Sequence, residues 1–144
     1  MASRLWTSDL TIGNDTQDAD HHKLVAVIDT VIASVNGRGD TSGTVLQLKN
    51  LIDFVQLHFA DEEAMMREWE CVSLDPHVAE HKRRLQQLRD LLLKVQSSEG
   101  VSQLSMHYLL REWLRQHILT FDMQMRAALI APRAGADRSV TLWN

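Results

Sequence analysis

The chain has one cysteine, Cys71, among its 144 residues. A single cysteine excludes an internal disulfide and fits a reducing cytosol. The N-terminus lacks the apolar run of a signal peptide, and no segment approaches the ~18 apolar residues that a membrane-spanning helix needs. We therefore expect a soluble, cytoplasmic protein.

Concentrated positive charge is also missing. The formal net charge is −4, the sequence pI is about 5.9, and the longest basic run is the triplet Lys82-Arg83-Arg84. This balance argues against nucleic acid or an anionic membrane as the main partner. The triplet itself is typical of the solvated face of a helix.

The sequence lacks the alternating apolar pattern of β-strands, and it has no glycine-rich phosphate loop or nucleophile elbow. Apolar residues instead recur at helical spacing in four segments separated by turn signals. The predicted helices span residues 18–35, 42–68, 76–97 and 102–129. Short loops between long helices favour antiparallel neighbours, so the predicted fold is all-α, an up-down-up-down four-helix bundle.

The two ends of the chain lack this periodicity. The first ~15 residues are predicted to form a non-helical arm, with Trp6 available to pack over one end of the bundle. The predicted bundle, arm included, occupies residues 1–130, and residues 131–144 form a predicted C-terminal tail that contains Trp143.

Histidines and acidic residues recur at helical spacing in the predicted helices. His58 and Glu62 are four residues apart, as are His77 and His81. Such pairs project to one side of a helix, within about 40° of each other, and can grip one metal. Imidazole combined with carboxylate is the ligand chemistry of iron and its neighbours, whereas calcium and magnesium prefer oxygen.

His117 and Asp122 are five residues apart, which separates their side chains by roughly 140° on a straight α-helix. Both reach one centre only if their rotamers compensate or the helix widens locally. A π-helical bulge would bring the angle to about 50°, and such bulges are frequent at functional sites.

One competing motif is the sequence His77-x-x-Glu80-His81, which matches the inverted zinc-protease pattern. That reading leaves His21, His58 and His117 unexplained, and such enzymes generally need a larger chain. Ferritin-like di-iron proteins use Glu-x-x-His pairs, which this chain lacks.

The combined motifs resemble those of the bacterial hemerythrins from about residue 6 to residue 129. The resemblance rests on four motifs: Asp18-Ala19-Asp20-His21, His58-Phe59-x-x-Glu62, His77-x-x-x-His81 and Trp113-Leu114-x-x-His117-Ile118-x-x-x-Asp122. His22 competes with His21 for the first ligand position. Counting from His21 places apolar residues at the positions expected to face the core, so His21 is favoured.

The resemblance implies a cofactor of two iron ions joined by an oxo or hydroxo bridge. His77, His81 and His117 would hold one iron, and His21 and His58 the other, which keeps an open position. Glu62 and Asp122 would bridge the two irons. Proteins of this family bind O2 reversibly at the open iron in the reduced state. Leu114, Trp113, Ile118 and Phe59 are candidates for the apolar walls of an O2 pocket.

The function implied is therefore reversible O2 binding, for transport, storage or delivery, without enzymatic turnover. Two alternatives remain open. One is an O2- or redox-sensing module that acts through a protein partner, which the sequence does not identify. The other is a di-iron oxidoreductase that handles peroxide or nitric oxide.

Overall fold

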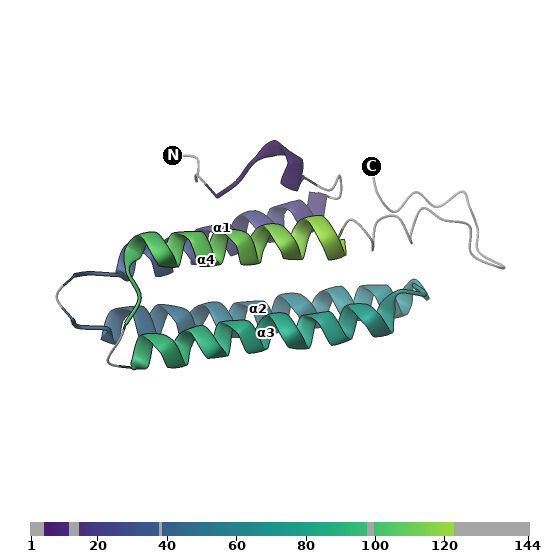
Figure 1. Cartoon of the computed structure of the whole chain (residues 1–144). Coiled ribbons are helices and arrows are strands. Elements are labelled where there is room, and N and C mark those ends of the chain that lie inside the picture. Colours follow the sequence, from purple (N-terminus) through teal and green to yellow (C-terminus); the bar gives the residue numbers. More distant parts are fainter. Residues whose placement is uncertain (1–4, 12–14, 38, 98–99, 123–144) are drawn as a thin grey trace.

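The computed structural model describes residues 5–11, 15–37, 39–97 and 100–122, and it does not place the side chains of Asp9, Thr120, Phe121 and Asp122. Its elements in chain order are η1 (Ser8–Leu10), α1 (Asp15–Ser34), α2 (Ser42–Glu68), α3 (Leu74–Gln96), α4 (Gln103–Gln116) and η2 (His117–Asp122). The long helices run alternately up and down (Figure 1), and the described residues contain no strand. The predicted all-α antiparallel bundle is confirmed.

The helix boundaries lie close to the predicted ones. α1 begins three residues earlier than predicted, at Asp15, and α3 two residues earlier, at Leu74. α2 has the predicted bounds. Ser102 was expected to open the last helix, and its Oγ indeed caps α4 by accepting a hydrogen bond from the backbone N–H of Ser105 at 3.1 Å. The predicted stretch 123–129 lies outside the described residues.

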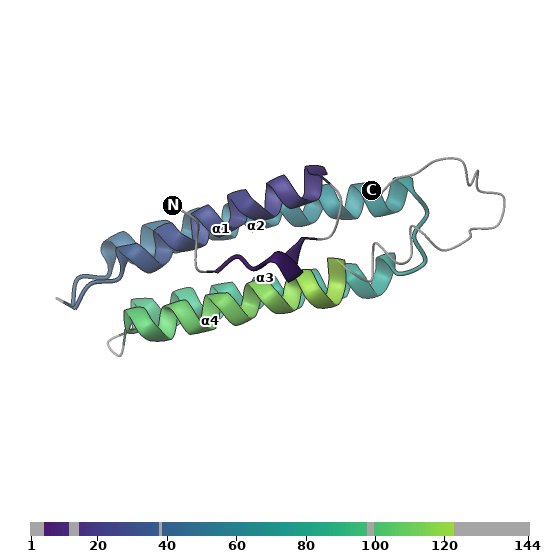
Figure 2. The same ribbon diagram turned by 90° about the horizontal axis from the view of Figure 1, so that it is seen from above.

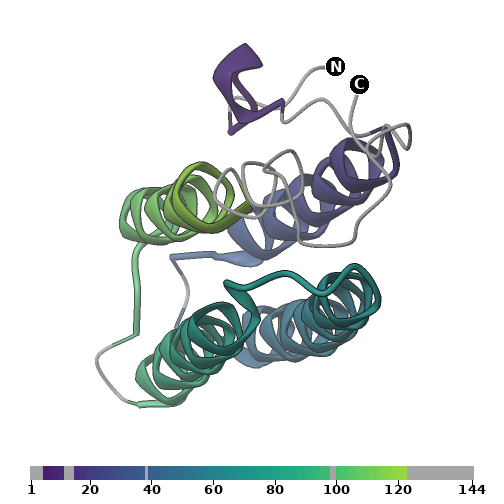
Figure 3. The ribbon, with the colours of Figure 1, turned by 90° about the vertical axis from the view of Figure 1, so that its right-hand side faces the viewer.

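Each long helix turns one apolar stripe toward a shared core. Viewed end-on, the four helices stand at the corners of a square, with α1 beside α2, α2 beside α3 and α4 beside α1 (Figure 3). Among the side chains that are at most 1% exposed are Leu24, Ile28, Leu48, Val55, Leu110 and Leu114. Burying several such leucine-sized side chains, at roughly 1.5–3 kcal/mol each, is the main force that holds the bundle together.

The turns between helices use backbone conformations suited to tight reversal. Gly39 lies in the predicted loop after α1 and has a φ of 79°, a left-handed conformation that glycine adopts without strain. Between α2 and α3, Glu70 adopts a φ of 54°, and the N–H of Cys71 bonds the carbonyl of Met66 at 2.9 Å. This tight connection brings the start of α3 back beside the end of α2.

The described part of the N-terminal arm, residues 5–11, lies along the face formed by α1 and α4 rather than over a bundle end as predicted (Figures 1 and 2). It contains one turn of 3-10 helix, η1, that the sequence did not predict. Leu5 and Leu10 are 1% and 0% exposed, because both insert into the core. Burying these two leucines favours a side-face position for the arm over an end-on one.

Among the helices that the structure describes, none is both long enough and apolar enough to cross a membrane.

Candidate metal centre

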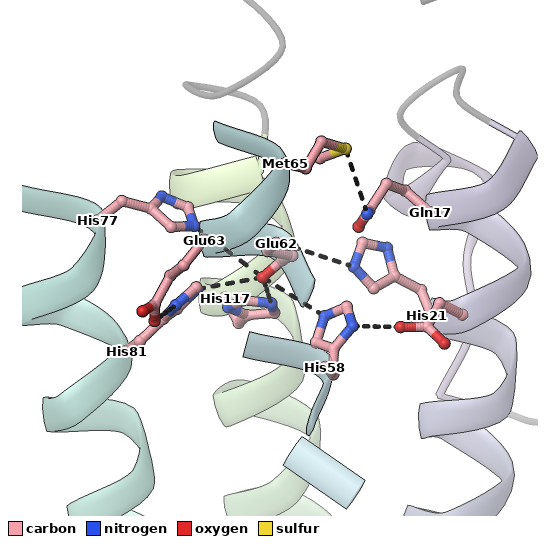
Figure 4. A network of polar contacts seen from close by, with 10 residues as sticks. Gln17, His21, His58, Glu62, Glu63, Met65, His77, His81 and His117 are labelled. Atoms are coloured by element: carbon pink, nitrogen blue, oxygen red, sulfur yellow. Dashed lines mark hydrogen bonds and ion pairs between the residues drawn. The ribbon is translucent and has the colours of Figure 1, made fainter. Parts of the chain in front are cut away.

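Five histidines and one glutamate from α1, α2, α3 and η2 meet in the interior of the bundle (Figure 4). They are His21, His58, Glu62, His77, His81 and His117. Each is between 0% and 3% exposed. Polar and ionisable groups are expensive to bury without partners, so this concentration points to a site with a shared purpose.

Glu62 is the point on which the imidazoles converge. The Nε2 atoms of His81, His58 and His117 lie 3.1, 3.6 and 3.6 Å from its carboxylate oxygens. Those of His21 and His77 are both at 4.0 Å. Five nitrogen donors around one carboxylate give a mixed N/O donor set.

The candidate ligand atoms fall into two overlapping groups that share Glu62. One contains His21, His58 and His117, and the other contains His77 and His81, with the donor atoms of each group within 4.8 Å of one another. A carboxylate common to two groups fits a centre with two metal ions. The resemblance assigns His117 to the same iron as His77 and His81. In this structure its donor atom groups instead with those of His21 and His58, so the assignment stays a prediction.

The helix that carries His117 changes type at that residue. α4 ends at Gln116 and continues as η2, a π-helix of six residues that runs from His117 to Asp122. The wider π-helical turn reduces the angle between residues five apart to about 50°. Local widening, one of the two routes by which His117 and Asp122 could reach one centre, is therefore present. The side chain of Asp122 lies outside the described residues, and its role as a ligand stays a prediction.

Two carboxylates that the sequence analysis did not single out as partners hold the outer nitrogens of two histidines. Nδ1–H of His58 donates to Asp20 on α1, and Nδ1–H of His81 donates to Glu63 at 2.7 Å. A proton on Nδ1 leaves the lone pair on Nε2, the nitrogen that faces Glu62. The two bonds therefore orient both rings as metal ligands require.

The surroundings shift the pKa of each outer carboxylate in a different direction. The hydrogen bond from His58 lowers the pKa of Asp20, with burial opposing it and the charges of His58, His21 and Lys23 adding to it. Burial raises the pKa of Glu63, while the charges of Arg67 and Lys82 oppose the rise. The sequence could have indicated both carboxylates, since each directly neighbours a candidate ligand. It could not have indicated which histidine each carboxylate binds, because that histidine lies on another helix.

Aromatic rings support the inner faces of the histidines. Phe59 stacks on His81 with ring centroids 3.8 Å apart and planes 2° apart, and Trp113 stacks on His117 at 5.9 Å and 21°. Leu114 and Ile118 are both 0% exposed. All four predicted wall residues are buried in the bundle, and their role as an O2 pocket stays a prediction.

His21 and His22 have opposite environments. His21 is fully buried and belongs to the ligand group, whereas His22 is exposed and its ring lies 3.8 Å from that of Trp6. The arm thus uses His22 as a packing partner, while His21 faces the centre.

Gln17 is a buried polar residue near the centre that the sequence did not reveal. It lies one helical turn before His21, is 6% exposed, and its Nε2 donates to the sulfur of Met65 at 3.9 Å (Figure 4). Its amide stays uncharged at any ordinary pH, so it can contribute hydrogen bonds to the surroundings of the centre but not a proton.

The prediction that the basic triplet is a solvated face is wrong for Arg84, which is 8% exposed. Glu80 of the competing protease motif is 5% exposed and pairs with Arg83 and Arg84 at 2.9 and 3.4 Å. Burial lowers the pKa of Arg84, and the charge of Glu80 opposes that shift. Because Glu80 lies among arginines rather than within the ligand groups, a zinc-protease arrangement is not formed.

Taken together, a four-helix bundle with a buried histidine and carboxylate centre defines a class of cation-binding helical proteins. A sequence model described as the hemerythrin HHE cation binding domain matches residues 12–129. The chain belongs to this family, as the resemblance of its motifs implied.

Several relatives resemble the chain over most of its length. A bacteriohemerythrin of Methylococcus capsulatus is 29% identical over 85% of this chain and 93% of its own. Myohemerythrin-1 of Phascolopsis gouldii is 29% identical over 87% and 93% of the two chains. A bacteriohemerythrin of Stenotrophomonas maltophilia is 27% identical over 82% and 76%. A crystal structure of a leucine-to-phenylalanine mutant aligns with a TM-score of 0.73 at 27% identity, covering 91% of this chain and all of that one.

Proposed function

We propose that the chain is a non-haem di-iron protein that binds O2 reversibly, for transport, storage or delivery. The observation that carries the proposal is the convergence of five buried imidazole nitrogens on Glu62, each within 4.0 Å. Family membership supports it, because the matching sequence model describes a cation binding domain and the described residues form a buried set of histidine and carboxylate donors.

The described residues, with Glu62 common to two groups of histidines, fit a centre of two irons. His77, His81 and His117 would hold one iron and His21 and His58 the other, with Glu62 and Asp122 bridging them. Iron accepts nitrogen and oxygen donors together, which is the donor set here. When bound, the pair of irons supplies the two electrons that O2 takes up on binding and returns on release.

The protein's own contribution is to orient ligands and exclude water. Asp20 and Glu63 fix the tautomers of His58 and His81, so the Nε2 lone pairs face inward. Leu114 and Ile118 are buried and lie three residues before and one residue after His117, so we assign to them the exclusion of water and acid from the centre. Among the described residues, the four candidate wall residues are all apolar or aromatic and buried, which favours reversible binding over an oxidoreductase that would need a proton donor at the open position.

An optical spectrum recorded through an anaerobic-to-aerobic cycle tests this function. Iron-loaded, reduced protein should gain visible charge-transfer bands under O2 and lose them when O2 is removed, over several cycles and without product. Bands that form once and persist under argon would favour an oxidoreductase. Protein that takes up iron and never gains such bands would exclude O2 binding.

A further inference from the structure

The packing between α3 and α4 is looser than the packing between α2 and α3. The backbones of α3 and α4 come close at fewer places, and a cavity of about 270 Å³ lies between them. Arg84 and Gln87 on α3, and Trp113 and Gln116 on α4, are among the residues that line it. Such a gap removes contacts between the two helices, so apolar packing alone fixes their relative position only weakly.

Arg84 bridges this gap from α3 to the last turn of α4. Its backbone carbonyl accepts a hydrogen bond from the indole Nε1–H of Trp113 at 3.0 Å, and its guanidinium donates to the side-chain oxygen of Gln116, also at 3.0 Å. The side chain of Arg84 is buried, and the carboxylate of Glu80 lies 3.4 Å from its guanidinium as a counter-charge. One residue of α3 therefore holds two residues of α4.

The residues that Arg84 holds lie directly before the change from α-helix to π-helix. α4 ends at Gln116, and η2 begins at His117. The backbone N–H of His117 bonds the carbonyls of both Trp113 and Leu114, and the ring of Trp113 stacks on that of His117. A π-helical turn is costly in isolation and persists when tertiary contacts require it. The contacts of Arg84 thus lie where such support is needed.

We propose that Arg84 is a positioning residue for His117, because it fixes the rotation and spacing of α4 against α3 just before the π-helix. Side-chain tips lie ~5–6 Å from a helix axis, so a rotation of α4 by about 10° would move the imidazole of His117 by ~1 Å. Metal–ligand distances tolerate deviations of only about 0.2 Å. The inference rests on the proposed metal centre, in which His117 is a ligand.

Gln116 is the sharpest place to test this role. Replacing Arg84 itself would also remove one counter-charge of the buried Glu80 and so change stability for a second reason. Gln116→Leu removes only the side-chain bond between Arg84 and α4. Gln87→Leu is its matched control, because Gln87 accepts from the same nitrogen of Arg84 at 3.2 Å but lies on α3. Both glutamines are exposed, so both leucine proteins should fold.

The experiment is a Co²⁺ titration of the full chain, followed by visible absorption. Co²⁺ accepts the same nitrogen and oxygen donors as Fe²⁺, and its visible bands change with ligand geometry. Gln116→Leu should weaken the binding of one of two Co²⁺ ions by about tenfold and change its bands, a loss at the lower end of that caused by removing outer groups that orient a ligand. Gln87→Leu should keep the affinity and bands of the parent chain. Gln116→Glu should keep them too, because a carboxylate accepts from Arg84 in place of the amide.

Unchanged affinity and bands in Gln116→Leu, or an equal loss in Gln87→Leu or Gln116→Glu, would overturn the role of Arg84. A parent chain that binds fewer than two Co²⁺ ions would instead contradict the proposed di-iron centre, and backbone amide exchange then decides the inference. Exchange at His117 and Ile118 should be about three- to tenfold faster in Gln116→Leu than in Gln87→Leu, the value of one lost hydrogen bond. Equal exchange rates in the two proteins would overturn the inference.

Discussion

Glu62 is the residue on which the chemistry of the centre depends. Its carboxylate is fully buried, and the nearest imidazole nitrogen lies 3.1 Å away. An ionised carboxylate in such a place needs positive charge close by. Metal ions held by the surrounding histidines would supply that charge, so we expect the burial of Glu62 to depend on metal binding.

His21 and His22 allow a paired test of the ligand register. His21→Ala should lower bound iron from two per chain to about one, because the second iron loses one of its two histidines. His22→Ala should keep both irons and normal spectra, since His22 packs on Trp6 at the surface. Iron analysis with optical spectra checks both proteins. If only the His22→Ala protein lost iron, the first ligand would be His22 and not His21.

The outer carboxylates should control how tightly metal is held. Asp20→Asn and Glu63→Gln each weaken the orientation of one histidine, and losses of about 10–100-fold in metal affinity are typical of such changes. Anaerobic Fe²⁺ titration measures the effect. Asp61→Asn is the control, because Asp61 is an exposed carboxylate on the same helix as Glu63. Equal affinities in all the proteins would make the outer bonds irrelevant to metal binding.

Spacing alone identified His58, His77 and His81, because their partners lie on the same helix. It missed the contacts of Asp20 and Gln17, whose partners lie on another helix, and the contact of Arg84 with Gln116 on α4. A side chain's neighbour across the bundle depends on how two helices are rotated about their axes. That rotation is not encoded in local spacing.

Among the elements, α4 was clearly predicted by its sequence pattern, whereas η2 was indicated only weakly. The apolar stripe and Ser102 cap predicted α4, whereas the π-helix was visible only through the odd spacing of His117 and Asp122. A π-turn is costly in isolation and persists when tertiary contacts require it. The sequence pattern could therefore indicate the need for a bulge but not its extent.

The buried face of α4 should protect bound O2. Leu114 is fully buried three residues before His117, so Leu114→Glu should place an acid beside the centre and hasten irreversible oxidation without removing either iron. Leu114→Met, which keeps an apolar side chain of similar size, is the control. The decay rate of the O2-bound spectrum is the readout. An unchanged decay rate in Leu114→Glu means that Leu114 only packs.

The start of α4 should depend on its cap. Ser102→Ala removes the bond to the N–H of Ser105 and should lower the free energy of unfolding by about 1 kcal/mol. Ser102→Asp should retain stability, since aspartate caps equally well. Urea unfolding of metal-free protein checks both. Equal stability of the alanine and aspartate proteins would show that the cap is unimportant.

At the scale of the whole molecule, the fold class was readable because each helix has its own apolar stripe and the loops are short. The arm's position was not, because Leu5 and Leu10 show no periodicity that would indicate the face of the bundle they cover. Their burial depends on core side chains from several helices, which come together only after the helices have packed.

Metal should stabilise the assembled bundle, because its ligands come from at least three separate helices. Binding to the folded state alone adds about 2.7 kcal/mol when free metal is 100 times its Kd. Thermal unfolding of loaded and chelator-treated protein should therefore give a clearly higher Tm for the loaded form. Equal Tm values would indicate that metal does not tie the helices together.

The most direct measurement is an anaerobic Fe²⁺ titration of the metal-free chain with quantitative O2 uptake at its endpoint. A buried carboxylate shared by two groups of histidines predicts an endpoint of two irons per chain and one O2 bound per iron pair, released again under argon. An endpoint of one iron per chain, or O2 consumed without release, would contradict a di-iron centre that binds O2 reversibly.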